Sequence, residues 1–240
     1  MRGGDCGFAV TFLHPQFTIL NPRYMKPTTI NKEKMCRKFG QKMMLTPERC
    51  ASPKCAFTRR SYAPGAHGQS RRRRPRSGYG EQLLEKQRIR ILYGVSERAL
   101  RRTVREALAR TRAAAASHNA LDVITSELER RLDNVLFRIG IAPSRAIARQ
   151  MVSHGHILVN GRRTTVPSRA LKVGETVSVR PQSAARMPFD ERREVLKKYK
   201  PPVWLTLDHE TLGGKMVALP TKDEIAQTAD VAKVVEFYAR

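Results

Sequence analysis

The sequence is poor in acidic and aromatic residues, and it lacks any long apolar run. Only 21 of its 240 residues are Asp or Glu, against 46 Lys or Arg, which gives a formal net charge of +25. A charge excess of this size suits a polyanionic partner. Aromatic residues make up 6% of the chain, which disfavours a basic membrane-surface helix with aromatic anchors. No apolar run is long enough for a transmembrane helix, so we expect nucleic acid rather than membrane.

Catalytic motifs are missing as well. The chain has no Walker-type phosphate loop, no GxSxG elbow and no HExxH pair. Metal binding is one interpretation of His154 and His156. The favoured one is a helix end followed by a strand, because a cation is favourable at a helix C-terminus. Asp133 stands close to Arg131, and a salt bridge at the helix surface or a hydrogen bond to the neighbouring turn is favoured over an acid that acts in catalysis. The sequence therefore predicts no enzyme.

Cysteine is scarce, and its spacing is not that of a secreted disulfide framework, which points to a reducing compartment. Cys50 and Cys55 flank a Ser-Pro turn and resemble half of a zinc knuckle, to which Cys36 would add a third thiolate. A structural zinc site needs four ligands. Glu33 and His67 are candidates for the fourth, and buried or idle thiols are the alternative. Zinc is thus an expectation with an incomplete ligand set, and no cofactor is required.

The clearest local order lies between Arg131 and Arg180. Apolar residues at helical spacing predict a helix over 131–139, and Gly140 can end it because glycine takes the left-handed cap conformation without steric penalty. Ser144 can cap a second helix, which stops at Gly155.

Two runs rich in β-branched residues follow and flank Asn160-Gly161, the strongest short-range signal for a tight hairpin. A last strand is predicted over Thr176–Val179. Together with the two helices, these strands predict a compact ααβββ module.

The arginines of this module indicate a binding surface. Arg145 and Arg149 are four residues apart and therefore project from one helical face. Arg162 and Arg163 leave the hairpin on alternate sides, so only one of them need share that face. A surface rich in arginine and poor in aromatics suits the backbone and shape of structured RNA. Charge alone does not exclude DNA.

The N-terminal half carries a second basic region. Arg59, Arg60 and the run Arg71–Arg74 lie in a stretch rich in Pro, Gly and Ser, which disfavours a helix, and the run repels itself without a partner. We predict a loop that phosphate contact orders. Helical spacing returns over 81–93, and Ser96 can cap a second helix that ends near Arg112. That helix carries three arginines on a broad face, which in part is simply solvated: Arg101, Arg102 and Arg105. Asn119 can cap a third helix.

The chain divides into four parts, with an α+β fold class. Residues 1–24 are expected to be a disordered extension or a mis-assigned start, with translation beginning at Met25; a signal peptide is the weaker alternative. Residues 25–128 are expected to form a mostly helical, basic N-terminal domain, and residues 129–193 are expected to form the ααβββ module. Residues 194–240 predict a short strand and helix extension that packs back on the N-terminal domain. Its expected strands are 204–207 and 215–218, joined through Gly213-Gly214, and its expected helix is 229–238.

The segments RLDNVLFRIG, SRAIARQMVSHGHILVNGRR and VPSRALKVGETVSV resemble the S-four RNA-binding domain. Flanking segments, PERCASPKCAFTRRSYAPGAHGQ, EKQRIRILYGVSERALRR, PPVWLTLDHETLGGKMVALP and EFYAR, resemble the bacterial family of small-subunit ribosomal protein four, over roughly Met35 to Arg240. The resemblance implies a primary rRNA-binding protein of the cytoplasmic ribosome. It would nucleate assembly of the 5′ domain of small-subunit rRNA and contribute to translational accuracy.

The same resemblance implies partners and site residues. Ribosomal proteins three and five would be neighbours, mRNA would pass close by where it enters the subunit, and neither a membrane nor a homo-oligomer is expected. Some members repress their own operon. The implied RNA contacts, with the three arginines above, are Arg59, Arg60, Arg71, Arg72, Arg73, Arg74, Ser144, Arg145, Arg149, His154, His156, Asn160 and Arg162. Asn160 is expected to shape its turn rather than to bind.

Two departures and two alternatives accompany the resemblance. Zinc-bearing relatives have a CxxC before the later cysteine pair, whereas this chain has Glu33 in place of the first cysteine. Residues 1–24 have no counterpart. An RNA-modifying enzyme, such as a pseudouridine synthase, also carries this module but needs a separate catalytic domain. A free regulatory RNA binder, related to heat-shock RNA-binding proteins, is disfavoured by the full-length match.

Overall fold

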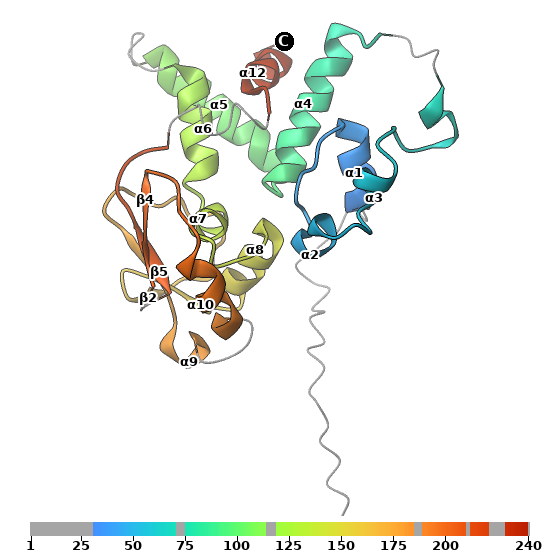
Figure 1. The fold of residues 1–240 in the computed structure, drawn as a ribbon. Helices are drawn as coiled ribbons and strands as arrows, with labels where there is room; N and C mark the ends of the chain where they lie inside the picture. Colours follow the sequence, from blue (N-terminus) through green and yellow to red (C-terminus); the bar gives the residue numbers. More distant parts are fainter. Residues whose placement is uncertain are drawn as a thin grey trace, which may run out of the picture. The chain divides into compact units, whose positions relative to one another are not determined.

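The computed structural model describes residues 31–70, 75–113, 119–184, 189–209, 212–220 and 229–239 (Figure 1). The expected start at Met25 and the Arg71–Arg74 run lie outside these residues. In chain order the elements are α1 (Lys32–Phe39), α2 (Pro47–Ala51), α3 (Ala56–Arg59), η1 (Ala66–Gln69), α4 (Gly78–Leu92), α5 (Glu97–Ala113), α6 (Ala120–Glu129), α7 (Leu132–Ile139), α8 (Arg145–Ser153), β1 (Ile157–Val159), β2 (Arg162–Arg163), β3 (Thr176–Val179), α9 (Pro181–Ala184), α10 (Phe189–Lys197), β4 (Leu205–Asp208), β5 (Gly213–Met216) and α12 (Val231–Ala239). The α+β prediction is confirmed.

Helices α4, α5 and α6 share one apolar core, which includes Ile89, Leu100 and Ile124. Their starts follow from capping residues. The Ser96 hydroxyl accepts a hydrogen bond from the Ala99 amide at 3.2 Å, and the Asn119 side chain accepts one from the Leu121 amide at 3.3 Å. Both predicted caps are confirmed, and each satisfies an amide that the first helical turn leaves without an intrahelical partner.

Helix α12 packs against α4, so the predicted return of the C-terminal helix to the N-terminal domain is confirmed (Figure 1). Val231 and Val234 are buried in the same core as α4. Lys86 on α4 donates to Glu97 at 2.9 Å, and its ammonium lies 4.3 Å from the centre of the Phe237 ring. The cation–π contact with Phe237 thus adds to the apolar packing of α12, while the ion pair with Glu97 joins α4 to α5.

The ααβββ module begins with α7 and α8, as predicted. Gly140 ends α7 at φ +93°, a backbone conformation that a side chain disfavours. The Ser144 hydroxyl accepts from the Ile147 amide at 3.3 Å and caps α8. The apolar faces of both helices, including Leu136 and Val152, pack against the sheet residues Ile157 and Val177 in a second core.

The strands form one antiparallel sheet in the order β2-β1-β3-β5-β4. Asn160 and Gly161 both have positive φ, 49° and 76°, as a two-residue type I′ hairpin requires. The Asn160 side chain also accepts from the Thr176 amide at 2.8 Å and ties the turn to β3. The prediction that Asn160 shapes the turn is therefore confirmed.

Strands β4 and β5 differ from expectation in two ways. Strand β5 pairs with β3 and β4 pairs with β5, so both extend the module's sheet, whereas sequence analysis placed them in an extension packing on the N-terminal domain. The glycines Gly213 and Gly214 lie inside β5 and not in the turn before it. A side chain at Gly214 would collide with the backbone carbonyl of Thr206 and press on Ile139, so close packing of α7 and β4 on this strand requires a glycine.

Candidate nucleic-acid interface

Five exposed arginines form a stripe along α5: Arg98, Arg101, Arg102, Arg105 and Arg112. At 3.6 residues per turn they occupy a sector of about 100°. The buried face of the helix, with Leu100, Val104 and Ala107, lies on the opposite side. The structure adds two arginines, Arg98 and Arg112, to the three that were predicted. Both are exposed because the apolar face of the helix is the one that is buried.

Charge within the stripe is largely uncompensated. Arg102 pairs with Glu106 one turn away at 3.2 Å. Among the described residues, none forms an ion pair with the other four arginines of the stripe. Arg110, on the flank of the same helix, differs because it donates to Glu127 of α6 at 2.8 Å. The stripe can therefore offer its guanidinium groups to phosphate oxygens.

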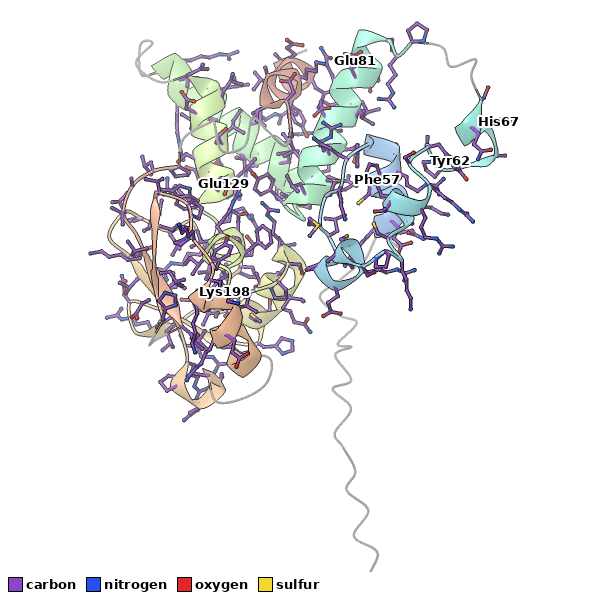
Figure 2. The ribbon with its side chains drawn as sticks, viewed as in Figure 1. Phe57, Tyr62, His67, Glu81, Glu129 and Lys198 are labelled. Atoms are coloured by element: carbon purple, nitrogen blue, oxygen red, sulfur yellow. The ribbon has the colours of Figure 1, made fainter. Side chains whose placement is uncertain are left out.

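Arg59 and Arg60 are exposed where α3 ends. The segment that follows them is held by protein contacts. Arg37 of α1 donates to the Tyr62 carbonyl at 3.0 Å, and its guanidinium lies 4.8 Å from the centre of the Tyr62 ring. Figure 2 shows Tyr62 and His67 along this segment. The described part of the basic loop is thus fixed to α1, while the role of phosphate in ordering the arginine run remains a prediction.

The hairpin presents Arg162 and the exposed His154. Arg163 turns the other way and crosses Gly155, where a side chain would collide with its guanidinium. It also donates to the His154 carbonyl at 3.4 Å. The two arginines therefore separate as the alternation of a strand predicts. His156 is half-buried, and its Nδ1 lies 3.0 Å from the Ser183 hydroxyl. It stands one residue before β1, which begins at Ile157, and not in the strand as the favoured interpretation expected.

The two arginines of α8 face the protein. Arg145 lies between the rings of Tyr93 and Phe137, 4.8 and 4.4 Å from their centres, and its Nε donates to Asn134 at 2.7 Å. Burial lowers the Arg145 pKa, and the charge of Glu129 partly opposes this effect. Sequence spacing placed Arg145 correctly on a helical face, but it could not reveal that two aromatic rings cover this face.

Arg149 uses all three of its guanidinium nitrogens within the protein. Its Nε and Nη2 donate to Asp133 at 3.2 and 2.8 Å, and its Nη1 donates to the Gly94 carbonyl at 2.6 Å. Asp133 is buried and also accepts two hydrogen bonds from Arg131, from Nε at 3.0 Å and from Nη2 at 2.8 Å. The predicted salt bridge between Arg131 and Asp133 is present, but it is buried and does not lie at the helix surface as expected. Ser144, the remaining predicted contact on α8, is buried as its cap.

Glu129 stands at the end of α6 with no exposed surface (Figure 2). It accepts hydrogen bonds from Tyr93 at 2.6 Å, from Asn134 at 2.6 Å, and from Arg138 at 2.9 and 2.7 Å. Burial alone would raise the Glu129 pKa, but the bonds and charge of Arg138, with Tyr93 and Arg145, lower it. The Tyr93 pKa is raised by burial and by the neighbouring carboxylate.

Comparison with known proteins identifies the family. Residues 28–125 match the Ribosomal protein S4/S9 N-terminal domain, and residues 130–177 match the S4 domain. The chain is 42% identical to small ribosomal subunit protein uS4 of Syntrophomonas wolfei over 207 residues, 86% of this chain and 96% of that protein. It is 43% identical to uS4 of Thermus thermophilus over 218 residues, 91% and 99% of the two chains. The chain belongs to the uS4 family. This is a family of structural ribosomal proteins and not of enzymes.

For this uS4 protein, the matched S4 domain runs from α7 into β3, so β4 and β5 extend the sheet beyond it. No helix among the described residues is long and apolar enough to cross a membrane.

Sequence reasoning missed the contacts made by Tyr93, Glu129 and Arg138. Tyr93 and Glu129 are 36 residues apart, and nothing in local spacing pairs them. The only available signal was an acidic residue on the apolar side of α6, one position after the buried Leu128.

The three cysteines that the structure describes, Cys36, Cys50 and Cys55, are free and buried. Burial raises the Cys36 pKa, with smaller contributions from Cys50 and Cys55, so these thiols share one neighbourhood. Backbone amides at the start of α3, foremost that of Thr58, lower the Cys55 pKa. Glu33, a candidate fourth ligand, is engaged by Arg49 in an ion pair. Among the described residues, no three His, Cys, Asp or Glu side chains are placed to hold a metal ion.

Zinc binding by these cysteines stays untested, and we expect the protein to fold without the metal, because its described thiols are buried and Arg49 already pairs with Glu33. Metal analysis of the purified protein should give well under one zinc per chain, and EDTA should leave the melting temperature unchanged. Cys50→Ser is the control, since it removes a central thiolate ligand. One zinc per chain that is lost in this variant would contradict the expectation.

Proposed function

We propose that this uS4 protein is a structural component of the small ribosomal subunit, in the cytoplasmic ribosome, and that it binds rRNA. The α5 stripe carries the proposal, because four of its five arginines form no ion pair with any described residue. Guanidinium groups recognise phosphate oxygens through paired N–H donors, and the shape of structured RNA is read largely through its backbone. The names of its relatives and its S4 domain support the same assignment.

The proposed RNA contacts are the predicted residues that remain exposed, together with those of the undescribed arginine run. From the described residues these are Arg59, Arg60, Arg101, Arg102, Arg105, His154 and Arg162, with Arg98 and Arg112 added from the stripe. Arg149, Ser144 and Asn160 are left out, because their side chains make hydrogen bonds within the protein. Arg145 is left out because its Nε donates to Asn134 and its guanidinium lies against two aromatic rings.

Finer aspects of this role are proposed from the likeness to the family. The protein would bind rRNA early and nucleate assembly of the 5′ domain of the small subunit. It would adjoin ribosomal proteins three and five, lie close to mRNA where it enters the subunit, and contribute to translational accuracy. Repression of its own operon would belong to the same RNA-binding surface.

Co-sedimentation tests the proposed function against the alternative of a free regulatory RNA binder. Cell extract is fractionated after a high-salt wash, and the protein is quantified in the small-subunit and soluble fractions. A subunit component is expected to stay with the small subunit, because contacts buried within a folded assembly are screened by salt much less than exposed contacts with phosphate. Complete transfer to the soluble pool would favour the regulator.

A further inference from the structure

The turn between α4 and α5 is tied to the S4 domain by two side chains of α8. Arg149 donates to the Gly94 carbonyl and to Asp133 of α7, and so bridges the two parts directly. Arg145 lies against Tyr93 of the turn and Phe137 of α7 and is fixed by Asn134. A second link runs from Tyr93 through Glu129 to Arg138. We name the residues Tyr93, Gly94, Glu129, Asp133, Asn134, Arg138, Arg145 and Arg149 the interdomain clamp.

Resting on the proposed function, we propose that Arg145 and Arg149 are positioning residues for RNA binding. They hold the α5 stripe and the hairpin in a fixed relation so that both surfaces engage one RNA molecule together. They do not themselves contact phosphate. This inference replaces the direct contact that sequence spacing suggested for both side chains.

Their occupied nitrogens support this role. For Arg149 to reach a phosphate, it would have to give up a 2.6 Å bond to a backbone carbonyl and an ion pair with a buried carboxylate. The carboxylate of Asp133 would then retain only Arg131. Arg145 would have to leave two aromatic rings, and the amide oxygen of Asn134 would lose the hydrogen bond that it accepts from Arg145. Both moves take a hydrogen-bond partner away from a buried polar group, which is unfavourable.

The chain path explains why the clamp affects both surfaces. The α5 stripe begins at Arg98, four residues after Gly94, and the hairpin leaves the end of α8, which carries both clamp arginines. Any change at the clamp therefore displaces the start of one surface relative to the other. Two linked binding surfaces act at a high effective concentration only when their geometry allows simultaneous engagement.

The test compares Arg149→Gln and Arg149→Lys with Arg162→Gln, an exposed arginine outside the clamp. The affinity of each full-length variant is measured over a range of salt concentrations for two RNAs. One is the 5′ domain of small-subunit rRNA, and the other is a short RNA duplex that can fill only one of the two surfaces. For both Arg149 variants we expect affinity for the 5′ domain to fall by about 10- to 100-fold. For the duplex, which fills only one surface, we expect both the affinity and the slope of log affinity against log salt to stay unchanged. Arg162→Gln should instead lower the slope by roughly 0.7–0.9.

Three outcomes would overturn the inference. A lower slope in Arg149→Gln that the lysine restores would mean direct phosphate contact. Equal losses on both RNAs would mean general damage to the fold, which circular dichroism would show independently. Full affinity of both variants for the 5′ domain would mean that positioning is unnecessary. If the unsubstituted chain itself fails to bind the 5′ domain, the proposed function fails instead.

Discussion

Replacing Glu129 with alanine is expected to lower the free energy of unfolding by about 3–5 kcal/mol, the cost of removing one partner from a buried ion pair. Glu129 has no exposed surface and accepts bonds from Tyr93, Asn134 and Arg138. Without it, the Arg138 guanidinium loses its counter-charge and the buried Tyr93 hydroxyl loses its acceptor. Urea denaturation followed by circular dichroism measures the change.

Glu106→Ala is the matched control, since it removes an exposed carboxylate paired with Arg102 and should cost at most about 1 kcal/mol.

The stability contributed by Glu129 depends on pH with a definite sign. Because folding lowers the Glu129 pKa, its contribution is complete above the unfolded value of about 4.3. It is lost as the pH falls through the lower folded value. The conservative variant Glu129→Gln should therefore lose less stability between neutral and acidic pH than the unsubstituted chain. Equal acid sensitivity of the two would contradict this account.

Removing four charges from the α5 stripe is expected to have the largest effect on RNA binding. The variant carries glutamine at positions 98, 101, 105 and 112, the arginines of the stripe that lack an ion-pair partner among the described residues. At roughly 0.7–0.9 slope units per phosphate contact, the dependence of log affinity on log salt should weaken by about 3 units. Affinity itself should fall at every salt concentration, because the attraction to phosphate is not specific to sequence.

Filter binding of the 5′ domain of small-subunit rRNA across a salt series measures both quantities. Arg110→Gln is the control, because that arginine lies on the same helix but pairs with Glu127, and its slope should equal that of the parent. The substituted positions are exposed, so the fold should be retained. A slope unchanged in the fourfold variant would place the rRNA on another surface.

Local features of this fold were predictable because their causes lie within a few residues. The Asn160-Gly161 turn, the Gly140 helix end and the Ser96 and Asn119 caps each follow from a backbone preference or one nearby hydrogen bond. The α5 stripe was predicted in part for the same reason, since the periodicity of one helix determines it.

Features that join distant segments were not predictable from spacing. Arg149 is 55 residues from Gly94, and no pattern in the sequence indicates that this arginine faces a backbone carbonyl rather than solvent. The pairing of β5 with β3 escaped prediction in the same way, because an edge strand accepts any compatible partner. The composition of the sequence thus indicated that arginines bind the partner. Only the tertiary contacts distinguish the arginines that stabilise the fold from the exposed ones that we propose bind RNA.

The position of α12 has a consequence for synthesis of the chain. Its contacts with α4 join residues as far apart as 154 positions, as between Gln82 and Glu236. While the polypeptide is being made, the apolar surface around Ile89 therefore stays incomplete until residues 231–239 have left the exit tunnel. The sheet likewise lacks β4 and β5 until late in translation. A chain released early would expose both unfinished cores, and quality-control proteases could distinguish it from a finished one before it ever met rRNA.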